Sequence, residues 1–393
     1  MRVFYFTEAP YPDLPPAQDY DSVRVTLPNE VCDPEISSEL YNRYLSEWEL
    51  ADAEGLDIMV NEHHQTPTCI NSAAPVILGA LARTTKRARL LVLGNPIANR
   101  NQPVRVAEEM ALIDCISRGR LECGFIRGVP FEIAPANSSP VRMYDRFFEA
   151  LDLIVKAWTT RNGPFSHEGR YFHHRMVNIW PRPFQQPHPP LWTASSSGNG
   201  ALEAGRRGYV LATFISGFKN TPNIFKGYRE GWAAAGRTAP PGLDRLAYAG
   251  FVYTGRTDKE GREGGQKLLW QMSQHANGPR WIANAPGYNS VAANVAAMRN
   301  AKPESRDNEH PVEMDVDDQI EKGNLFCGSP ETVVKQIRRF YDAVGGFGNL
   351  LAIGQAGFMG HEETAAGIRL LAREVFPRLK EFGEPAGSRA AAE

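Results

Sequence analysis

Cysteine is scarce in this sequence of 393 residues, which contains five cysteines and no CxxC pair. Such an odd, scattered set argues against a disulfide framework and against a zinc ribbon. We expect free thiols in a reducing compartment and a cytoplasmic location. No apolar run approaches the roughly 18–20 residues needed to span a bilayer. The N-terminus enters a predicted strand at once, so we expect neither a membrane segment nor a signal peptide.

An excess of charge of either sign is also lacking. The chain has 43 basic and 45 acidic residues, and its formal net charge is −2. This balance gives no electrostatic reason to expect a nucleic acid or a lipid surface as a partner. The hydrophobic fraction of 42% is ordinary for a globular protein with a large core.

Several short motifs with a known mechanism are missing. The sequence contains no HExxH zinc motif, no P-loop, no GxGxxG run and no GxSxG nucleophile elbow, so a serine hydrolase is disfavoured. Potential metal ligands do occur at Glu62, His63 and His64, and again at His173 and His174. Adjacent residues rarely converge on one ion, so we expect a site without a metal.

Apolar runs of strand length alternate with longer segments of helical period along most of the chain. Several runs are continuously apolar, which is typical of parallel strands buried on both faces. The predicted strands cover residues 3–7, 56–60, 90–93, 121–126, 191–194, 209–213, 247–254 and 350–354. The predicted helices cover residues 37–53, 72–83, 104–116, 144–158, 201–206 and 364–376, and another begins at Ser329-Pro330-Glu331 with the serine as its cap.

Eight strands that alternate with helices predict an α/β fold of the closed (β/α)8 type, the TIM barrel. An open, doubly wound sheet is the alternative, but it usually needs fewer alternations. We expect one domain over residues 1–382 and a flexible tail at 383–393. Two insertions, near residues 9–33 and 271–322, are assigned to strand-to-helix connections on the face where a barrel binds substrate, as lids or disordered loops.

Polar residues follow the predicted strand at 56–60, at the end where parallel α/β folds place their chemistry. Here Asn61 and Glu62 are followed by His63 and His64. A histidine in this position can carry a proton, bind a reactive oxygen or simply pack beneath a loop. Neighbouring side chains of an extended chain point to opposite sides, so at most one of the two should face the barrel mouth. We predict that His63 is catalytic and that Glu62 orients it.

Three later strand ends carry groups suited to a flat or anionic ligand. Glycine in Gly94-Asn95 lets the backbone approach a flat ligand closely, although an ordinary turn would look the same. Arg127 ends a buried strand, where it needs either a bound anion or an internal carboxylate. Ser195-Ser196-Ser197 opens a predicted helix, whose first amides favour an anion, whereas a simple helix cap needs only one serine.

Longer segments of the chain resemble one family of enzymes. The combined order and spacing of these segments resemble those of the bacterial luciferase-like flavin monooxygenase superfamily, over most of the chain. In two places the chain departs from that pattern: Gln102 stands where the family often has histidine, and Ile126 stands where luciferase proper has a reactive cysteine, so light emission is not implied. The segments that carry the resemblance are Glu62-His63-His64 and residues 102–109, 114–121, 124–128, 144–149 and 328–331.

The resemblance implies a barrel that binds reduced FMN, usually as a homodimer, with a separate flavin reductase supplying the flavin. Oxygen then adds to the flavin, and the resulting flavin hydroperoxide oxygenates a small organic substrate. By position, His63 is similar to the family histidine near that hydroperoxide, and Gly94-Asn95 lies where many members carry a non-proline cis peptide bond. The groups that the resemblance assigns to the FMN phosphate are Arg127, Tyr144, Ser195 and Ser196.

Two other functions stay open at this point. One is a deazaflavin-dependent oxidoreductase that transfers a hydride on the same scaffold. The other is a non-catalytic flavin-binding protein that stores or carries FMN. The presence of His63 favours catalysis, but a fold alone does not decide between chemistries.

Overall fold

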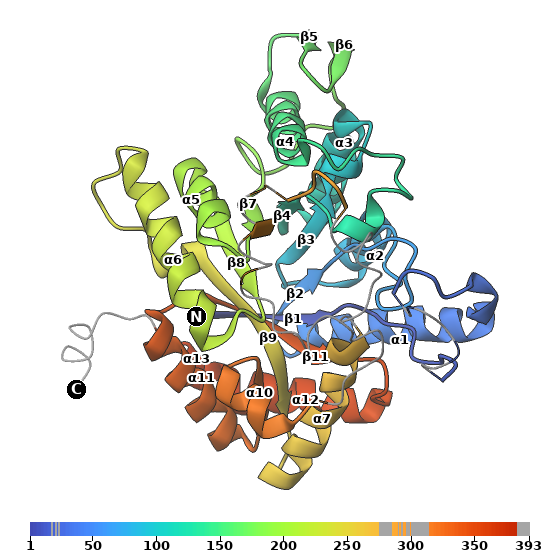
Figure 1. The fold of residues 1–393 in the computed structure, drawn as a ribbon, viewed down its shortest axis with the longest axis vertical. Helices are drawn as coiled ribbons and strands as arrows, with labels where there is room; N and C mark the ends of the chain where they lie inside the picture. The colour runs from blue at the N-terminus through green and yellow to red at the C-terminus, as the bar shows by residue number, and fades with distance from the viewer. Residues whose placement is uncertain are drawn as a thin grey trace.

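The computed structural model describes residues 1–16, 19, 22, 24–274, 285–289, 291, 294, 295, 299 and 314–382. In these residues a parallel sheet closes into a barrel, because β8 pairs with β9 as well as with β7. Figure 1 shows the helices arranged around the strands. The strands of the closed barrel are β1 (Arg2–Thr7), β2 (Asp57–Val60), β3 (Leu90–Pro96), β4 (Leu121–Ile126), β7 (Leu191–Ala194), β8 (Val210–Phe214), β9 (Leu246–Thr254) and β11 (Asn349–Gln355).

Most helices lie close to their predicted positions. The first begins earlier than predicted, at Pro34, because Asp33 Oδ1 accepts hydrogen bonds from the backbone N–H groups of Glu35 at 2.7 Å and Ile36 at 3.4 Å. The helices are α1 (Pro34–Ala53), α2 (Ala74–Thr84), α3 (Pro103–Ser117), α4 (Met143–Thr159), α5 (Gly198–Arg207), α6 (Gly217–Ala234), α7 (Asp258–Gln274), α10 (Val316–Lys322), α11 (Pro330–Val344), α12 (His361–Leu370) and α13 (Phe376–Leu379).

Two details near the end of the chain differ from the prediction. Ser329 occupies the N-cap position of α11, but its hydroxyl donates to Oδ1 of Asp258 at 2.7 Å and makes no capping hydrogen bond. The helix predicted at 364–376 begins at His361 and passes through a π-helical turn at Leu371–Val375 before α13.

The predicted (β/α)8 fold class is confirmed, and each of the eight predicted strands is a strand of the closed barrel. Three strands were not predicted. β10 (Leu325–Gly328) pairs in parallel with the last four residues of β9. β5 (Phe165–Glu168) and β6 (His173–Val177) form a separate antiparallel hairpin, which projects beyond α4 at the top of Figure 1. Most of the predicted insertion at 271–322, and the tail at 383–393, lie outside the described residues.

Two layers of apolar side chains explain why these strands close into a barrel. In β1, Phe4 and Phe6 pack with side chains from other strands across the interior, whereas Val3 and Tyr5 pack with residues of the surrounding helices. Successive side chains of a strand point to opposite faces, so a strand buried on both faces is apolar throughout. The same alternation in the other strands makes a packed core instead of a pore.

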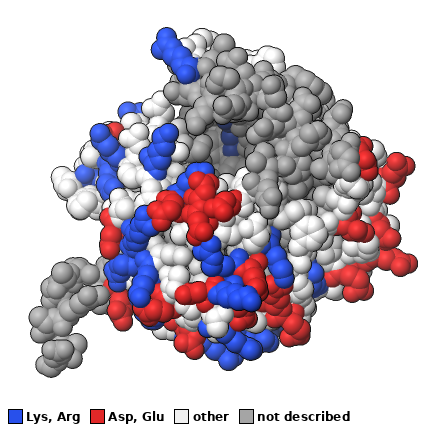
Figure 2. Space-filling view, turned by 60° about the horizontal axis from the view of Figure 1, so that its bottom comes forward, with Lys and Arg blue, Asp and Glu red and all other residues white. Residues whose placement is uncertain are grey.

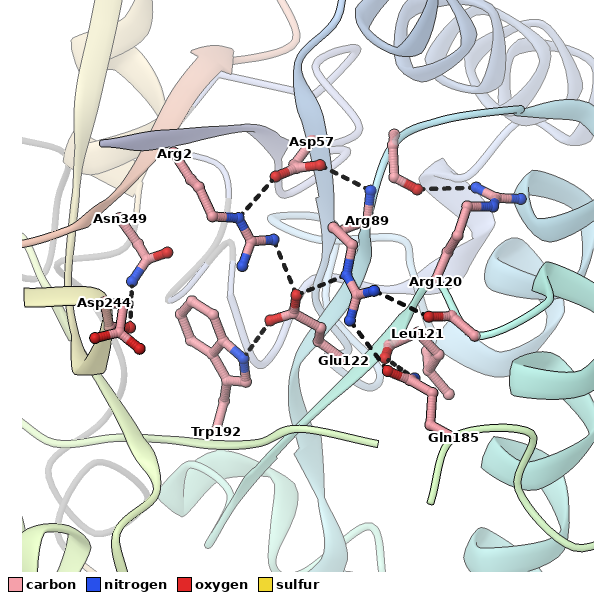
Figure 3. A network of polar contacts seen from close by, with 12 residues as sticks. Arg2, Asp57, Arg89, Arg120, Leu121, Glu122, Gln185, Trp192, Asp244 and Asn349 are labelled. Atoms are coloured by element: carbon pink, nitrogen blue, oxygen red, sulfur yellow. Dashed lines mark hydrogen bonds and ion pairs between the residues drawn. The ribbon is translucent and has the colours of Figure 1, made fainter. Parts of the chain in front are cut away.

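A polar network fills the amino-terminal end of the barrel (Figure 3). Glu122, on β4, is almost fully buried, and its Oε1 is 2.9 Å from both Arg2 Nη2 and Arg89 Nε. Its Oε2 accepts a hydrogen bond from the indole N–H of Trp192 at 2.6 Å, while Arg2 also pairs with Asp57 at 3.0 Å. These charged and polar groups pair with one another, so this end of the barrel has a structural role. The candidate functional residues lie at the opposite rim.

The surface charges agree with the balanced composition. On the face in Figure 2, Lys and Arg are interspersed with Asp and Glu over the lower half of the described surface. Among the described residues, no helix combines the length and the apolar character needed to cross a membrane.

Candidate functional site

The predicted site residues lie at the carboxyl ends of neighbouring parallel strands and therefore share one rim of the barrel. His63 follows β2, Gly94 and Asn95 belong to the end of β3, Arg127 follows β4 and Ser195 follows β7. The pairing order β2-β3-β4-β7 places these four strand ends side by side. His63 and Arg127 are consequently on the same rim, as predicted from the sequence.

The four groups assigned to a phosphate meet in one open cavity of about 980 Å³. They come from three different elements: the end of β4, the first turn of α4 and the connection from β7 to α5. Phe147, Phe148 and Phe214 add apolar surface to the same cavity. The four phosphate candidates that line it are Arg127, Tyr144, Ser195 and Ser196.

Arg127 is held in place by Tyr288, a residue that the sequence did not single out. The guanidinium carbon is 3.7 Å from the centroid of the Tyr288 ring, and Nη1 donates to the Tyr288 carbonyl oxygen at 3.3 Å. The Tyr288 hydroxyl in turn donates to the carbonyl oxygen of Gly128 at 2.7 Å. No carboxylate among the described residues pairs with Arg127 within 4.0 Å, so its charge stays available to a bound anion.

The serine turn before α5 combines a structural role with an exposed one. Ser197 is the N-cap, and its Oγ accepts a hydrogen bond from the backbone N–H of Gly200 at 3.3 Å. The Ser195 hydroxyl donates to the Ser197 carbonyl oxygen at 2.9 Å, which tightens the turn. Ser196 is exposed in the cavity. One serine therefore caps the helix, and the others lie at the positive end of the α5 dipole.

Tyr144 brings a neutral hydroxyl to the same cavity. Its ring packs edge-on against Phe148, with 4.8 Å between the centroids. Partial burial raises the pKa of the Tyr144 phenol above its usual value, so the hydroxyl keeps its proton at neutral pH and can donate to an anion.

Both histidines lie beside Glu132, whose Oε1 is 3.5 Å from His64 Nδ1, and His64 also contacts Glu62. His63 Nδ1 lies 3.0 Å from Oε1 of Glu132, and His64 Nε2 lies 3.2 Å from Oε1 of Glu62. The His63 ring is 13% exposed and the His64 ring 28%.

Glu62 does not contact His63, although the sequence led us to expect that it would orient this ring. Its buried carboxylate forms ion pairs with Arg100 and His64, and Oε2 accepts a hydrogen bond from the backbone N–H of Ala74 at 2.9 Å. Ala74 is the first residue of α2, so Glu62 caps that helix. The end of β2 positions Glu62 beside α2, while a residue from another loop sets the orientation of His63.

Glu132 orients His63 and was missed in the sequence. It ends the short 3-10 helix η4 (Pro130–Glu132) in the connection from β4 to α4. Its Oε1 also accepts from the backbone N–H of His64 at 3.0 Å, and Oε2 accepts from that of Val129 at 3.3 Å. Glutamate in a loop of 16 residues carries no periodic signal, so only the fold could reveal this partner.

The histidines and carboxylates shift one another's protonation. Burial alone would raise the pKa of Glu132, but its bonds to His63 and His64 hold that pKa at about 2. Hydrogen bonds to Glu132 and Glu62 raise the pKa of His64 to about 9. At neutral pH Glu132 is therefore an anion and His64 a cation.

Part of the first insertion covers the histidines. Arg24 lies over the ring of Phe131, with 4.6 Å from the guanidinium carbon to the centroid, and Phe131 lies 6.1 Å from the His63 ring. The backbone N–H of Ile70 donates to the carbonyl oxygen of Ala9 at 3.0 Å, which ties the start of the insertion to the connection after β2. The described part of 9–33 thus lies on the carboxyl-terminal face of the barrel, as predicted.

The end of β3 is shaped for close approach. The Leu93–Gly94 peptide bond is cis, at the place that the family resemblance implied. A Cβ atom at Gly94 would overlap the side chain of Ile126. Asn95 is fully buried, and neither Oδ1 nor Nδ2 has a hydrogen-bond partner among the described residues. A buried amide without a partner is costly, and it suits a ligand that offers both a donor and an acceptor.

The described part of the chain holds no group of three or more His, Cys, Asp or Glu side chains arranged to bind a metal ion. Glu62 contacts Arg100 and His64, and His63 contacts Glu132.

Comparison with known proteins places the chain in a family. A family model described as luciferase-like monooxygenase matches residues 25–346. The oxygenase component of flavin-dependent trigonelline monooxygenase from Acinetobacter baylyi is 30% identical over 173 residues, which are 43% of this chain and 47% of that protein, so the match spans about half of the relative. The 2,5-diketocamphane 1,2-monooxygenase 2 of Pseudomonas putida is 25% identical over 86% of this chain and 95% of its own length.

Solved structures share the fold. The oxygenating constituent of 3,6-diketocamphane monooxygenase from Pseudomonas putida, in complex with FMN, superposes with a TM-score of 0.70 over 96% of this chain and 98% of its own, at 19% identity. Proteins that depend on coenzyme F420 also have this fold. The family match covers well over half of the chain, and the chain belongs to the luciferase-like monooxygenase family.

Proposed function

We propose that the chain is the oxygenase of a two-component flavin monooxygenase, which takes reduced FMN from a separate reductase and uses O2 to oxygenate a small organic substrate. The observation that carries this proposal is the cavity at the rim, where an arginine without a carboxylate partner meets a serine turn at a helix N-terminus. Charge-assisted hydrogen bonds from such groups suit a phosphate. Arg127, Ser195 and Ser196 would hold it, with Tyr144 as a neutral donor.

The remaining residues of the rim fit the ring of FMN. Gly94 lets the backbone at the end of β3 pack directly against Ile126, and the amide of Asn95, which has no partner among the described residues, offers a donor and an acceptor to the polar edge of the ring. When bound, reduced FMN supplies the electrons that activate O2. The chain itself would bind and orient the ligand, hold a proton at His63, and exclude water through the connection that carries Arg24.

The flavin-dependent relatives support FMN as the cofactor of this chain. Because F420-dependent proteins have the same fold, a deazaflavin is the alternative cofactor to test. The deciding experiment mixes the protein with reduced FMN or with reduced deazaflavin, admits O2, and follows oxygen consumption and product mass. The substrate panel includes trigonelline and diketocamphanes, which the names of the relatives suggest. We expect an oxygen atom in the product with FMN only. Turnover with the deazaflavin, without oxygen incorporation, would overturn the assignment.

A second part of the proposal concerns assembly as a homodimer. On the outward side of α2, the apolar side chain of Val76 is 71% exposed. On α3, which packs beside α2, Leu112 is 50% and Ile116 43% exposed. Apolar side chains gathered on two adjacent helices are typical of a surface that another molecule covers. A second copy of the chain is our proposal for that molecule.

A further inference from the structure

The charge state of Glu132 decides which nitrogen of His63 carries a hydrogen atom. Because its pKa is held at about 2, Glu132 is an ionised carboxylate at neutral pH and can only accept hydrogen bonds. In the 3.0 Å contact between His63 Nδ1 and Glu132 Oε1, the hydrogen atom therefore belongs to Nδ1. A neutral imidazole has only one N–H, so a neutral His63 carries a lone pair on Nε2.

The charged groups around His63 balance one another. Two buried carboxylates, Glu132 and Glu62, face two cations, His64 and Arg100. From the connection after β1, Arg24 also faces this cluster, and Glu8 acts on Arg24 with a charge of the opposite sign. Each carboxylate therefore has a cation other than His63 beside it.

Nε2 is the one polar atom of the His63 ring that is left for a ligand. Nδ1 is taken by Glu132, and no described residue makes a hydrogen bond to Nε2. The ring is 13% exposed and is flanked by Phe131, so the surroundings shield it while leaving a small opening at the rim.

We propose that Glu132 is a positioning residue that fixes the ring hydrogen of His63 on Nδ1, so that Nε2 accepts a proton from the bound reactants. A proton leaving an O–H or N–H group of a reactant would move to Nε2, its bonding electron pair would stay on the reactant, and the ionised Glu132 would stabilise the imidazolium that forms. The identity of the reactant rests on the proposed function, whereas the tautomer does not.

The test is nitrogen NMR of the protein labelled with 15N-histidine, at pH 7.5 and without flavin. We expect His63 of the wild-type protein to show a protonated Nδ1 and an unprotonated Nε2. In Glu132→Gln the amide can donate as well as accept, so we expect the hydrogen to appear on Nε2 in a substantial fraction of molecules. Glu132→Asp keeps an ionised acceptor, and we expect it to restore part of the wild-type signal.

Turnover under the proposed reaction gives a second readout. We expect kcat to fall by up to about 100-fold in Glu132→Gln, with FMN affinity within about twofold of wild type and partial recovery in Glu132→Asp. A wild-type His63 that is protonated on Nε2 would overturn the proposal even if no variant folds. An unchanged tautomer in folded Glu132→Gln would also overturn it. If His63 shows the expected tautomer but the protein oxygenates no substrate, the proposed function is contradicted and the role of Glu132 is still supported.

Discussion

Single residues at the rim form two groups, one around Arg127 and one around His63. Arg127 lies against Tyr288 in the large cavity, and His63 lies against Glu132 beneath the first insertion. The connection from β4 to α4 links them, because Arg127 begins it and Glu132 lies five positions later. A single loop thus positions both Arg127, the proposed anion-binding group, and Glu132, the partner of His63.

Arg127→Ala should weaken binding of the FMN phosphate without weakening binding of the rest of the flavin. A hydrogen bond to a charged group contributes about 1.5–3 kcal/mol, so we expect FMN affinity to fall roughly 10- to 150-fold while riboflavin, which lacks the phosphate, changes little. Fluorescence titration with the two flavins measures this. The control is Arg175→Ala on the β5–β6 hairpin, where the side chain is 81% exposed and pairs with Glu168. Equal losses for both flavins would contradict the phosphate assignment.

His64→Gln should change how stability depends on pH. The folded pKa of His64, about 9, exceeds the unfolded value of about 6.5, so its contribution is fully present below pH 6.5 and is lost as pH rises through 9. The ring is partly exposed, and with solvent screening we expect on the order of 1–2 kcal/mol at pH 6. Urea unfolding of both proteins from pH 6 to pH 10 measures the difference, which should shrink with pH.

The control for His64→Gln is His173→Gln, since the His173 side chain is 62% exposed on the hairpin. We expect a much smaller difference from wild type there. A His64→Gln difference that grows with pH would mean that the ring is not held as a cation by Glu62 and Glu132.

At this scale the sequence predicted which residues stand at the rim, but not all of their partners. His63, Arg127 and Ser195 were identifiable because each follows an apolar run at a strand end. Glu132 and Tyr288 lie in long connections, where contacts depend on how the loop folds back. Glu62 shows the same limit, since it is adjacent to His63 in sequence but faces α2 and Arg100.

Among the elements, the barrel strands were the most predictable part of the fold. Strands buried on both faces leave uninterrupted apolar runs, and all eight were identified from them. The hairpin was missed because β5 and β6 pair only with each other and are mostly exposed. β10 was missed because its four residues lie close to the segment assigned to an insertion. Pairing with one end of β9 decides its structure, and sequence periodicity does not record that.

Glycines allow α5 and α6 to pack with their backbones in contact. A Cβ atom at Gly231 would overlap the carbonyl oxygen of Leu202, and one at Gly205 would overlap that of Tyr228. We expect Gly231→Ala to destabilise the protein by about 1–3 kcal/mol, because the helices must move apart. Thermal and urea unfolding measure this.

Gly79→Ala is the matched control for Gly231→Ala. Gly79 also lies within a helix, but nothing lies within 4 Å of the position of its Cβ atom. Alanine there should stabilise α2 by up to about 1 kcal/mol, since glycine loses more backbone entropy in a helix. If both substitutions stabilised the protein, the close packing of α5 on α6 would be disproved.

For the whole molecule, the exposed apolar side of α2 and α3 predicts self-association. Val76→Asp places a charge on that surface, and burying an unpaired carboxylate is strongly unfavourable. We expect light scattering to give a dimer for the wild-type protein and a monomer for this variant. The control is Phe358→Asp, which replaces another exposed apolar side chain that packs against Trp270 of α7. A wild-type monomer would contradict the proposed assembly.

The central claim is that one flavin spans the rim, from the serine turn to the histidine. A crystal structure of this protein with FMN bound measures that directly. We predict the phosphate within hydrogen-bond distance of Arg127 and the Ser195-Ser196 turn, and the ring against Gly94 with His63 facing it. FMN at the opposite end of the barrel, or a phosphate that contacts none of these residues, would contradict the account.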